Sequence, residues 1–223
     1  TYVNAYDQKM FMKREVIADK GIWTAKKRYI LQVHDSEGVR YAKPKLKIMG
    51  IETTRSSTPM VVRTKLKEAI SLVLSSDEQT IQKFIADFKQ EFKSLPPEDV
   101  AFPRGCNGMV KYRDVSSIYR KGTPIAVKGA LLYNFHLKDK GLDRKYEVIK
   151  DGEKVKFLYL KVPNTINDTV VSFTSRLPVE LDLHEYVDYN KQFEVSFLEP
   201  LKTILVSREW SAEKTATLEG LFG

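Results

Sequence analysis

The chain has 223 residues, 42% of them apolar, and a formal net charge of +8. This length and apolar content predict one or two folded domains. No run of about 18 apolar residues occurs and no signal peptide opens the chain, so we expect a soluble, intracellular protein. The single cysteine, Cys106, excludes an internal disulfide framework and fits a reducing compartment.

The positive charge is concentrated near the start of the chain. Residues 1–50 hold eleven Lys and Arg, minus five Asp and Glu, for a net charge of +6. A positive, non-repetitive surface favours an acidic partner, most often nucleic acid and less often an anionic membrane. The chain begins with Thr1, and residues 2–6 start in the middle of a strand pattern, which predicts a fragment of a longer protein.

Several enzyme classes lack their signatures here. The three histidines, His34, His136 and His184, are scattered, with no Cys or carboxylate at metal-ligand spacing. Neither a Gly-rich phosphate loop nor a Gly-x-Ser-x-Gly sequence occurs. We therefore expect the histidines to be structural or exposed.

Three adjacent cations, Lys26, Lys27 and Arg28, lie between Trp23 and Tyr29, and the strand-like residues 30–33 follow at once. Cations held in one register suit a nucleic-acid groove, where they neutralise phosphates or reach acceptors on base edges. The same pattern is also typical of a solvated strand edge that discourages aggregation. Both interpretations stay open on the residues alone.

Residues 29–33 and 38–42 flank a turn-rich stretch at 35–38, which predicts an antiparallel hairpin with the cations at the entry to its first strand. Further on, Leu46 and Ile48 alternate with Lys45 and Lys47. This alternation places the two lysines on one outward face, either as a second basic ridge or as the solvated side of a half-buried strand.

Two helices are predicted next. The first starts with Thr58 as N-cap and Pro59 at the first helical position, after Ser57. Its amides and hydroxyls could hold a phosphate, although a plain cap explains the same residues. The second starts at Ser75 with Glu78 as capping-box partner and ends at residues 96–97. Their apolar and aromatic stripes predict a helical hairpin with a shared core.

The second half of the chain predicts a mixture of elements. Residues 98–123 are expected to be irregular, and a third helix runs from Thr123 and Pro124 to Lys140 and Gly141, with Lys128 on its outer face. Residues 146–150 and 155–160 are predicted to form a hairpin around an Asp-Gly turn. A strand at 170–173 and a final helix that stops before residue 200 complete the pattern.

The tail, residues 211–223, is polar and then carries Leu218, Leu221 and Phe222. A few apolar and aromatic side chains at the end of a polar segment predict a docking peptide. Either a separate partner protein or the chain's own surface could receive it.

Several stretches resemble one family, the replicative family B DNA polymerases of T-even-like bacteriophages. They are the runs 21–29 and 41–50, the residues 51–53 with 56–59, the run 128–134, and the short apolar tail. The run 21–29 is similar to a Lys-rich sequence ending in Tyr that lies in the family's palm and touches the minor groove near the primer terminus. The likeness covers nearly the whole chain and is densest before residue 59.

The resemblance implies an α+β fold, with antiparallel strands from the end of the palm followed by a mainly helical thumb that carries a small antiparallel sheet. It divides the chain into a palm end at 1–50, a thumb at 51–210 and a clamp-binding tail at 211–223. The residues expected to contact DNA are Lys26, Lys27, Arg28, Tyr29, Lys45, Lys47, Ser57, Thr58, Lys111 and Lys128. Leu218, Leu221 and Phe222 are expected to bind the sliding clamp.

The stretch 111–117 looks like the family's catalytic sequence but departs from it. That sequence, Tyr-Gly-Asp-Thr-Asp-Ser, supplies two aspartates that bind two metal ions. Here Asp114 has no second aspartate, and it follows the basic stretch, whereas the family's pair precedes it. The resemblance therefore implies that the catalytic aspartates and their Mg²⁺ ions lie upstream, outside this chain, which binds no cofactor itself.

The predicted function is that of the C-terminal portion of a DNA-directed DNA polymerase, a nucleotidyltransferase, gripping primer-template DNA in the cytoplasm of an infected bacterium. The fragment alone is predicted to be inactive, and its partners are the DNA, the upstream exonuclease, palm and fingers, and the sliding clamp. Two alternatives stay open: a stand-alone nucleic-acid-binding accessory protein, and a protein whose only partner is the clamp.

Overall fold

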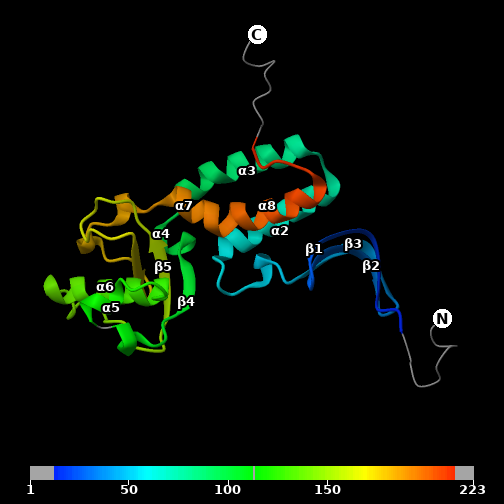
Figure 1. The fold of residues 1–223 in the computed structure, drawn as a ribbon. Coiled ribbons are helices and arrows are strands. Elements are labelled where there is room, and N and C mark those ends of the chain that lie inside the picture. Colours follow the sequence, from blue (N-terminus) through cyan, green and yellow to red (C-terminus); the bar gives the residue numbers. More distant parts are fainter. Residues whose placement is uncertain (1–12, 113, 214–223) are drawn as a thin grey trace, which may run out of the picture. The chain divides into compact units, whose positions relative to one another are not determined.

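The computed structural model describes residues 13–112 and 114–213, and the chain divides into two compact units, residues 1–54 and 55–223 (Figure 1). Two three-stranded antiparallel sheets and several helices give the mixed α and β architecture that the sequence predicts. The units divide near the predicted boundary at residue 50, and their assignment to palm and thumb stays a prediction. The strand pattern of residues 2–6 lies outside the described residues.

The first unit is a meander of three strands, β1 (Val16–Ala25), β2 (Arg28–Ser36) and β3 (Val39–Met49), followed by the short helix η1 (Glu52–Thr54). Ile22 pairs with Ile30 and Ile30 with Ile48, so one apolar row crosses all three strands. The predicted hairpin is confirmed: β2 and β3 are joined by a turn at Glu37 and Gly38, whose positive φ angles of 54° and 89° match the right-handed twist of the strands.

The second unit begins with a helical hairpin, as predicted. Helices α2 (Met60–Ser75) and α3 (Glu78–Lys93) pack against each other and against the later segment α7 (Tyr189–Phe193), η5 (Glu194–Leu198) and α8 (Glu199–Leu205). Four aromatic rings form the core between α3 and this segment, with centroid separations of 4.8 Å between Phe88 and Phe197 and 5.4 Å between Phe92 and Phe193. Edge-to-face rings at these separations add stability beyond their buried area.

A small sheet forms the rest of the second unit, in the order β4 (Phe102–Gly105), β5 (Lys154–Tyr159) and β6 (Val170–Phe173). The predicted third helix is confirmed as α6 (Ile125–Asp139), and it packs on β5 and β6. Gly129 makes this approach possible, because a Cβ there would lie 2.7 Å from the backbone nitrogen of Ser172. The remaining short helices are α4 (Pro97–Val100), η2 (Met109–Tyr112), α5 (Val115–Ile118), η3 (Val179–Leu181), η4 (His184–Tyr186) and η6 (Val206–Arg208).

The first predicted helix start is wrong by one residue and the second by two. Pro59 has an extended ψ of 145°, so α2 begins at Met60, and Thr58 is buried without making a cap hydrogen bond. Ser75 is the last residue of α2, since its hydroxyl donates back to the Ser71 carbonyl at 2.8 Å. Asp77 caps α3 instead, accepting a 2.8 Å hydrogen bond from the Thr80 amide.

The predicted hairpin of residues 146–150 with 155–160 is also wrong. The side chain of Asn134 on α6 occupies both backbone groups of Ile149, accepting from its N–H and donating to its carbonyl at 2.7 Å each. Residues 146–150 therefore form no strand, and β5 pairs with β4 and β6. The expectation of an irregular 98–123 overlooked β4, whereas the predicted strand at 170–173 is confirmed as β6.

The final helix does not stop before Pro200. The chain passes from α7 through the π-helical segment η5 into α8, where Pro200 lies within the first two positions. Proline lacks an amide donor and is tolerated in a first helical turn, so a change of helix type just before it lets the segment continue to Leu205.

Candidate nucleic-acid interface

The basic stretch lies at the entry to β2, the first strand of the predicted hairpin, as expected, and this entry is a tight turn that follows β1. Lys26 and Lys27 connect β1 to β2, and Ala25 and Arg28 face each other across the turn. Both lysines are exposed, and no carboxylate within the described residues forms an ion pair with either. Two positive side chains therefore stand at the tip of a paired ladder, where the backbone position is held by the strands.

The backbone of this turn depends on one glycine. Lys27 has a φ of 63°, a left-handed conformation that costs an ordinary residue about 1–2 kcal/mol. Gly50, itself at a φ of 69°, approaches the turn so closely that a Cβ there would lie 2.5 Å from the Lys27 carbonyl oxygen. The backbone just after β3 therefore packs closely against the basic turn.

Arg28 has a different role from its two neighbours. Its guanidinium Nη2 lies 3.0 Å and 3.2 Å from the two carboxylate oxygens of Glu52, and both side chains are partly buried. Glu52 lies on η1, so the pair ties the start of β2 to the end of the unit. Arg28 was predicted to contact DNA, and the structure places its charge against a carboxylate of the same unit.

Aromatic and basic side chains share one face of the sheet near the turn. Tyr29 pairs with Trp23 on one side and Met49 on the other, and Trp23 is 66% exposed. Lys45 and Lys47 occupy alternate positions of β3 and share a face, as predicted, with Lys45 exposed and its ammonium 4.1 Å from the centroid of the Tyr41 ring. The cation–π contact orients Lys45 without neutralising it.

The second unit carries a groove of about 430 Å³ that sequence reasoning missed, called here the basic groove because two cations line it. It is lined by Ser56, Ser57, Pro103, Arg104, Gly105 and Lys154. Arg104 donates from Nη1 to the Ser57 carbonyl at 2.7 Å, which fixes the guanidinium at the groove, and partial burial lowers the pKa of Arg104 from its ordinary value. Lys154 faces Gly105 across the β4–β5 ladder. Arg104 and Lys154 reach the same groove because β4 pairs with β5, although the two residues are 50 positions apart in the sequence. No local sequence pattern indicates this pairing.

The remaining predicted residues of the second unit lie in varied surroundings. Ser57 lines the groove, Thr58 is buried, and Lys111 is exposed on η2. Lys128 does not stand free on the outer face of α6, because its ammonium lies 2.8 Å from the carboxylate of the buried Asp168. The clamp-binding prediction for Leu218, Leu221 and Phe222 falls outside the described residues.

Other chemistry is not assembled in the part of the chain that the structure covers. Across residues 13–112 and 114–213, no group of three His, Cys, Asp or Glu side chains could hold a metal ion. Asp114 is exposed and precedes α5. None of the helices within these residues is both long enough and apolar enough to cross a membrane.

Comparison with known proteins relates the whole chain to one kind of enzyme. It is 35% identical to the DNA-directed DNA polymerase of Enterobacteria phage T4 and 37% identical to that of Escherichia phage RB69, over 100% and 99% of this chain. This chain is a relative of the T-even phage DNA polymerases. It spans about a quarter of the length of these curated relatives, 26% and 25%. No protein-family model matches it.

Within the described residues, the basic turn and the basic groove are two surfaces that gather positive charge. Each combines exposed or partly exposed cations with a backbone position fixed by strand pairing. Surfaces of this kind are typical of proteins that contact the phosphate and sugar groups of nucleic acids. Each lies within its own unit.

Proposed function

We propose that this chain is the C-terminal part of a phage DNA polymerase, comprising the end of the palm and the thumb, and that it grips primer-template duplex DNA. The observation that carries this proposal is the pair of exposed lysines at the β1–β2 turn in a chain that is similar over its whole length to phage DNA polymerases. The similarity supplies the class of partner, and the turn supplies a surface of matching charge.

The geometry suits a contact with the minor groove. Acceptors occur there on every base pair, so a lysine held at a fixed position can bind without reading sequence. Lys27 is our first choice for this contact, and Tyr29 supports the turn from β2 beside Trp23. A mispair displaces these acceptors, so the proposed Lys27 contact would be lost and extension of the mispaired primer would slow.

Phosphate contacts from other positions complete the proposed grip. Lys26, Lys45 and Lys47 would follow the backbone on the first unit, with Lys111 on the second. Arg104 and Lys154 join them, because a fixed guanidinium and an exposed ammonium place two positive charges in one groove with Ser57. Arg28 and Lys128 contribute less directly, since each already faces a carboxylate.

Nucleotide transfer belongs, in this proposal, to the complete polymerase in the cytoplasm of the infected host. The catalytic aspartates and the Mg²⁺ ions that they hold lie in the upstream portion, and this chain alone is inactive. Residues 211–223 tether the polymerase to a sliding clamp through Leu218, Leu221 and Phe222, a pattern that suits insertion of apolar side chains into a groove.

The test is a titration of a labelled primer-template duplex across a salt series. The double variant Lys26→Ala/Lys27→Ala should bind more weakly, and its slope of log affinity against log salt should be shallower by about one, since Lys26 is the proposed phosphate contact of the pair and each such contact contributes about 0.9. Arg28 is left intact so that the Glu52 ion pair survives.

Lys67→Ala/Lys93→Ala is the matched control, removing two exposed charges from α2 and α3. It should lower affinity slightly and leave the slope close to that of the wild type. Equal slopes for the two double variants would show that the turn is a solvated edge, and the proposed grip would be abandoned.

A further inference from the structure

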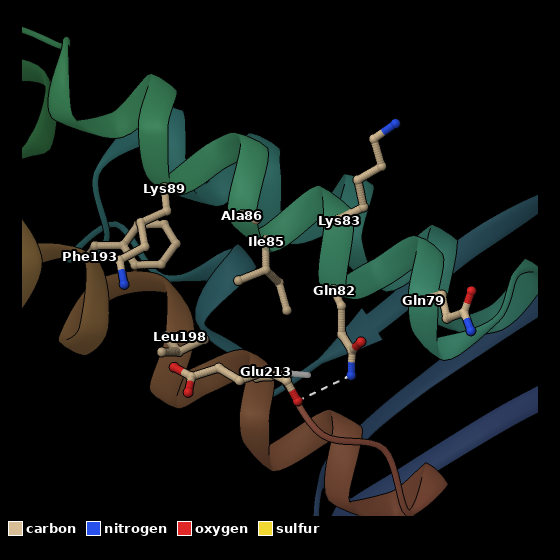
Figure 2. Close-up of a pocket in the computed structure, with 10 residues that line it drawn as sticks. Gln79, Gln82, Lys83, Ile85, Ala86, Lys89, Phe193, Leu198 and Glu213 are labelled. Atoms are coloured by element: carbon tan, nitrogen blue, oxygen red, sulfur yellow. Dashed lines mark hydrogen bonds between the residues drawn. The ribbon is translucent and has the colours of Figure 1, made fainter. Parts of the chain in front are cut away.

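A groove of about 570 Å³ runs along α3 on the second unit and shares no lining residue with the basic groove. Figure 2 shows Gln82, Ile85 and Lys89 of α3 on one side, Phe193 and Leu198 on the other, and Glu213 across the front. Its lining residues are Gln79, Gln82, Lys83, Ile85, Ala86, Lys89, Phe193, Leu198, Ala212 and Glu213. A cavity of this size matches sites that receive several side chains.

The lining is apolar at depth and basic at the rim. Ile85, Phe193 and Leu198 are each less than 9% exposed and form the floor, whereas Lys83 is exposed and Lys89 is half-buried. Figure 2 shows Lys83 pointing outward from α3. The chemistry therefore fits a short apolar-aromatic segment that carries a carboxylate.

The chain itself delivers such a segment to this groove. The Ser211 amide donates to Glu78 Oε1 at 2.6 Å, and Gln82 Nε2 donates to the carbonyls of Ser211 at 3.1 Å and Glu213 at 3.3 Å. Ala212, between them, is 7% exposed. Two side chains at the start of α3 thus hold the backbone at the rim of the groove up to Glu213.

The residues that follow Glu213 have the matching composition. They read Lys-Thr-Ala-Thr-Leu-Glu-Gly-Leu-Phe-Gly, with Leu218, Leu221 and Phe222 as large apolar side chains and Glu219 as their acidic member. Five residues from Glu213 to Leu218 span up to about 17 Å when extended, and the groove along α3 from Gln82 to Lys89 is about 10 Å long by the helical rise. The apolar residues can therefore reach all of it.

We propose that this groove is a docking site for the chain's own segment 218–222, with Leu218, Leu221 and Phe222 on the apolar floor and Glu219 beside Lys83 or Lys89. The tether makes the occupant specific, because a ligand joined to the rim by a few residues has an effective concentration of about millimolar. This docking depends neither on the proposed DNA contacts nor on a clamp.

One consequence does rest on the proposed function. The apolar residues that fill the groove are the ones proposed to bind a sliding clamp, so the two sites would compete for a single segment. Without the clamp, the groove would keep these side chains covered. Clamp binding would then require release of the segment from α3.

The test uses the full chain with a nitroxide attached through Gly223→Cys. Cys106 can stay, since burial raises the pKa of its thiol to about 11 and the labelling reagent needs the thiolate. Methyl NMR should show loss of the Ile85 and Leu198 signals next to the nitroxide, with recovery on its reduction. The methyls of Val155 and Val171, which do not line the groove, should persist.

A matched pair of variants locates the docking site. Ala86→Glu places a longer charged side chain on an exposed lining position of α3 and should restore the Ile85 and Leu198 signals. Gln90→Glu adds the same charge to the same helix outside the groove and should leave the loss unchanged. If Ala86→Glu fails to fold, Leu218→Ser/Leu221→Ser/Phe222→Ser makes the same test without changing a residue that lines the groove.

Two results would overturn the proposal. Ile85 and Leu198 signals that persist beside the nitroxide would show that the segment does not occupy the groove. A loss that appears only when labelled chains are mixed with unlabelled, isotope-enriched chains would identify a second copy as the occupant, contradicting docking within one chain.

Discussion

Glu180 has a strongly lowered pKa and couples the stability of the second unit to acid pH. The Lys145 ammonium contacts its Oε1 at 2.5 Å and the Tyr146 hydroxyl donates to its Oε2 at 2.7 Å. These two bonds, that of Lys145 first, lower the pKa of Glu180 from 4.5 to about 2. A carboxyl group with a lowered folded-state pKa stabilises the fold above its unfolded pKa, and this contribution is lost as the pH falls.

We therefore expect the stability difference between wild type and Glu180→Gln to depend on pH. The wild type should have the higher thermal midpoint above about pH 5, and the difference should shrink as the pH falls from 4.5 to about 2. Glu185→Gln, at an exposed neighbouring position, is the control and should show no such dependence. Thermal unfolding followed by circular dichroism measures both, and a constant offset across this range would contradict the assignment.

Lys128 and Asp168 form an ion pair whose acidic member is buried. Asp168 is 5% exposed and its Oδ1 also accepts from the Thr169 amide at 2.7 Å, while the Lys128 ammonium lies 4.6 Å from the Tyr119 ring centroid. Removing one partner of a buried pair leaves a charge without compensation, at a cost of about 3 kcal/mol or more.

Lys128→Met should accordingly lower the free energy of unfolding by about 3 kcal/mol, whereas the double variant Lys128→Met/Asp168→Asn should recover most of that loss. Urea unfolding of the three proteins measures the coupling. The double variant should bind the duplex with the same salt slope as the wild type. A shallower slope would instead show that Lys128 contacts DNA, as the sequence predicted.

The backbone that packs against the basic turn should matter for DNA binding as much as the two lysines of the turn do. Gly50→Ala adds a Cβ that would lie 2.5 Å from the Lys27 carbonyl and forces alanine to a φ of 69°, so the turn must move. Gly38→Ala is the matched control, because it has a φ of 89° but no atom within 4 Å of the added Cβ.

Both glycine variants should lose about 1–2 kcal/mol of stability from the left-handed backbone. Only Gly50→Ala should also weaken binding of the primer-template duplex, because it displaces Lys27. The measurements are urea unfolding and the duplex titration. Equal affinities in the two variants would mean that the position of the turn does not matter for binding.

Elements whose signals are local could be predicted from the sequence. The β2–β3 hairpin follows from its turn residues, and α6 follows from Pro124 at its start and Gly141, with a φ of 66°, at its end. Strand β4 could not be found in this way, because Pro103 and Gly105 read as loop residues and only pairing with β5 makes them a strand. The missed hairpin has the same cause, since Asn134 competes for Ile149 from 15 residues away.

The same distinction holds for the candidate interface. Exposure of Lys26 and Lys27 follows from adjacent cations next to a strand, and the sequence predicted it. The partner of Arg28 lies 24 residues away and that of Lys128 lies 40 residues away, so neither ion pair has a local signal. Arg104 and Lys154 are brought to one groove by strand pairing alone.

Because the whole chain covers only about a quarter of each relative's length, its activity can be predicted only together with the missing portion. The chain matches about a quarter of the T4 phage polymerase, so we expect a chimera in which this chain replaces that quarter to incorporate nucleotides into a primer. The T4 protein lacking the matched quarter, and this chain alone, should not. If the chimera folds and is inactive while the chain alone binds duplex tightly, the accessory-protein interpretation would replace the polymerase one.

The chimera also allows the proposed role of Lys27 to be tested without disturbing the turn. Lys27→Gly removes the side chain and suits the observed φ of 63°, so the backbone strain is relieved rather than increased. A hydrogen bond from a charged group contributes about 1.5–3 kcal/mol, so extension of a matched primer should slow by roughly tenfold or more. Extension of a mispaired primer should change little, because the displaced acceptor has already lost the contact. The ratio of the two rates should thus move toward one, and single-turnover extension measures it. An unchanged ratio would remove Lys27 from mispair sensing and leave it, with Lys26, as a cation that holds phosphates.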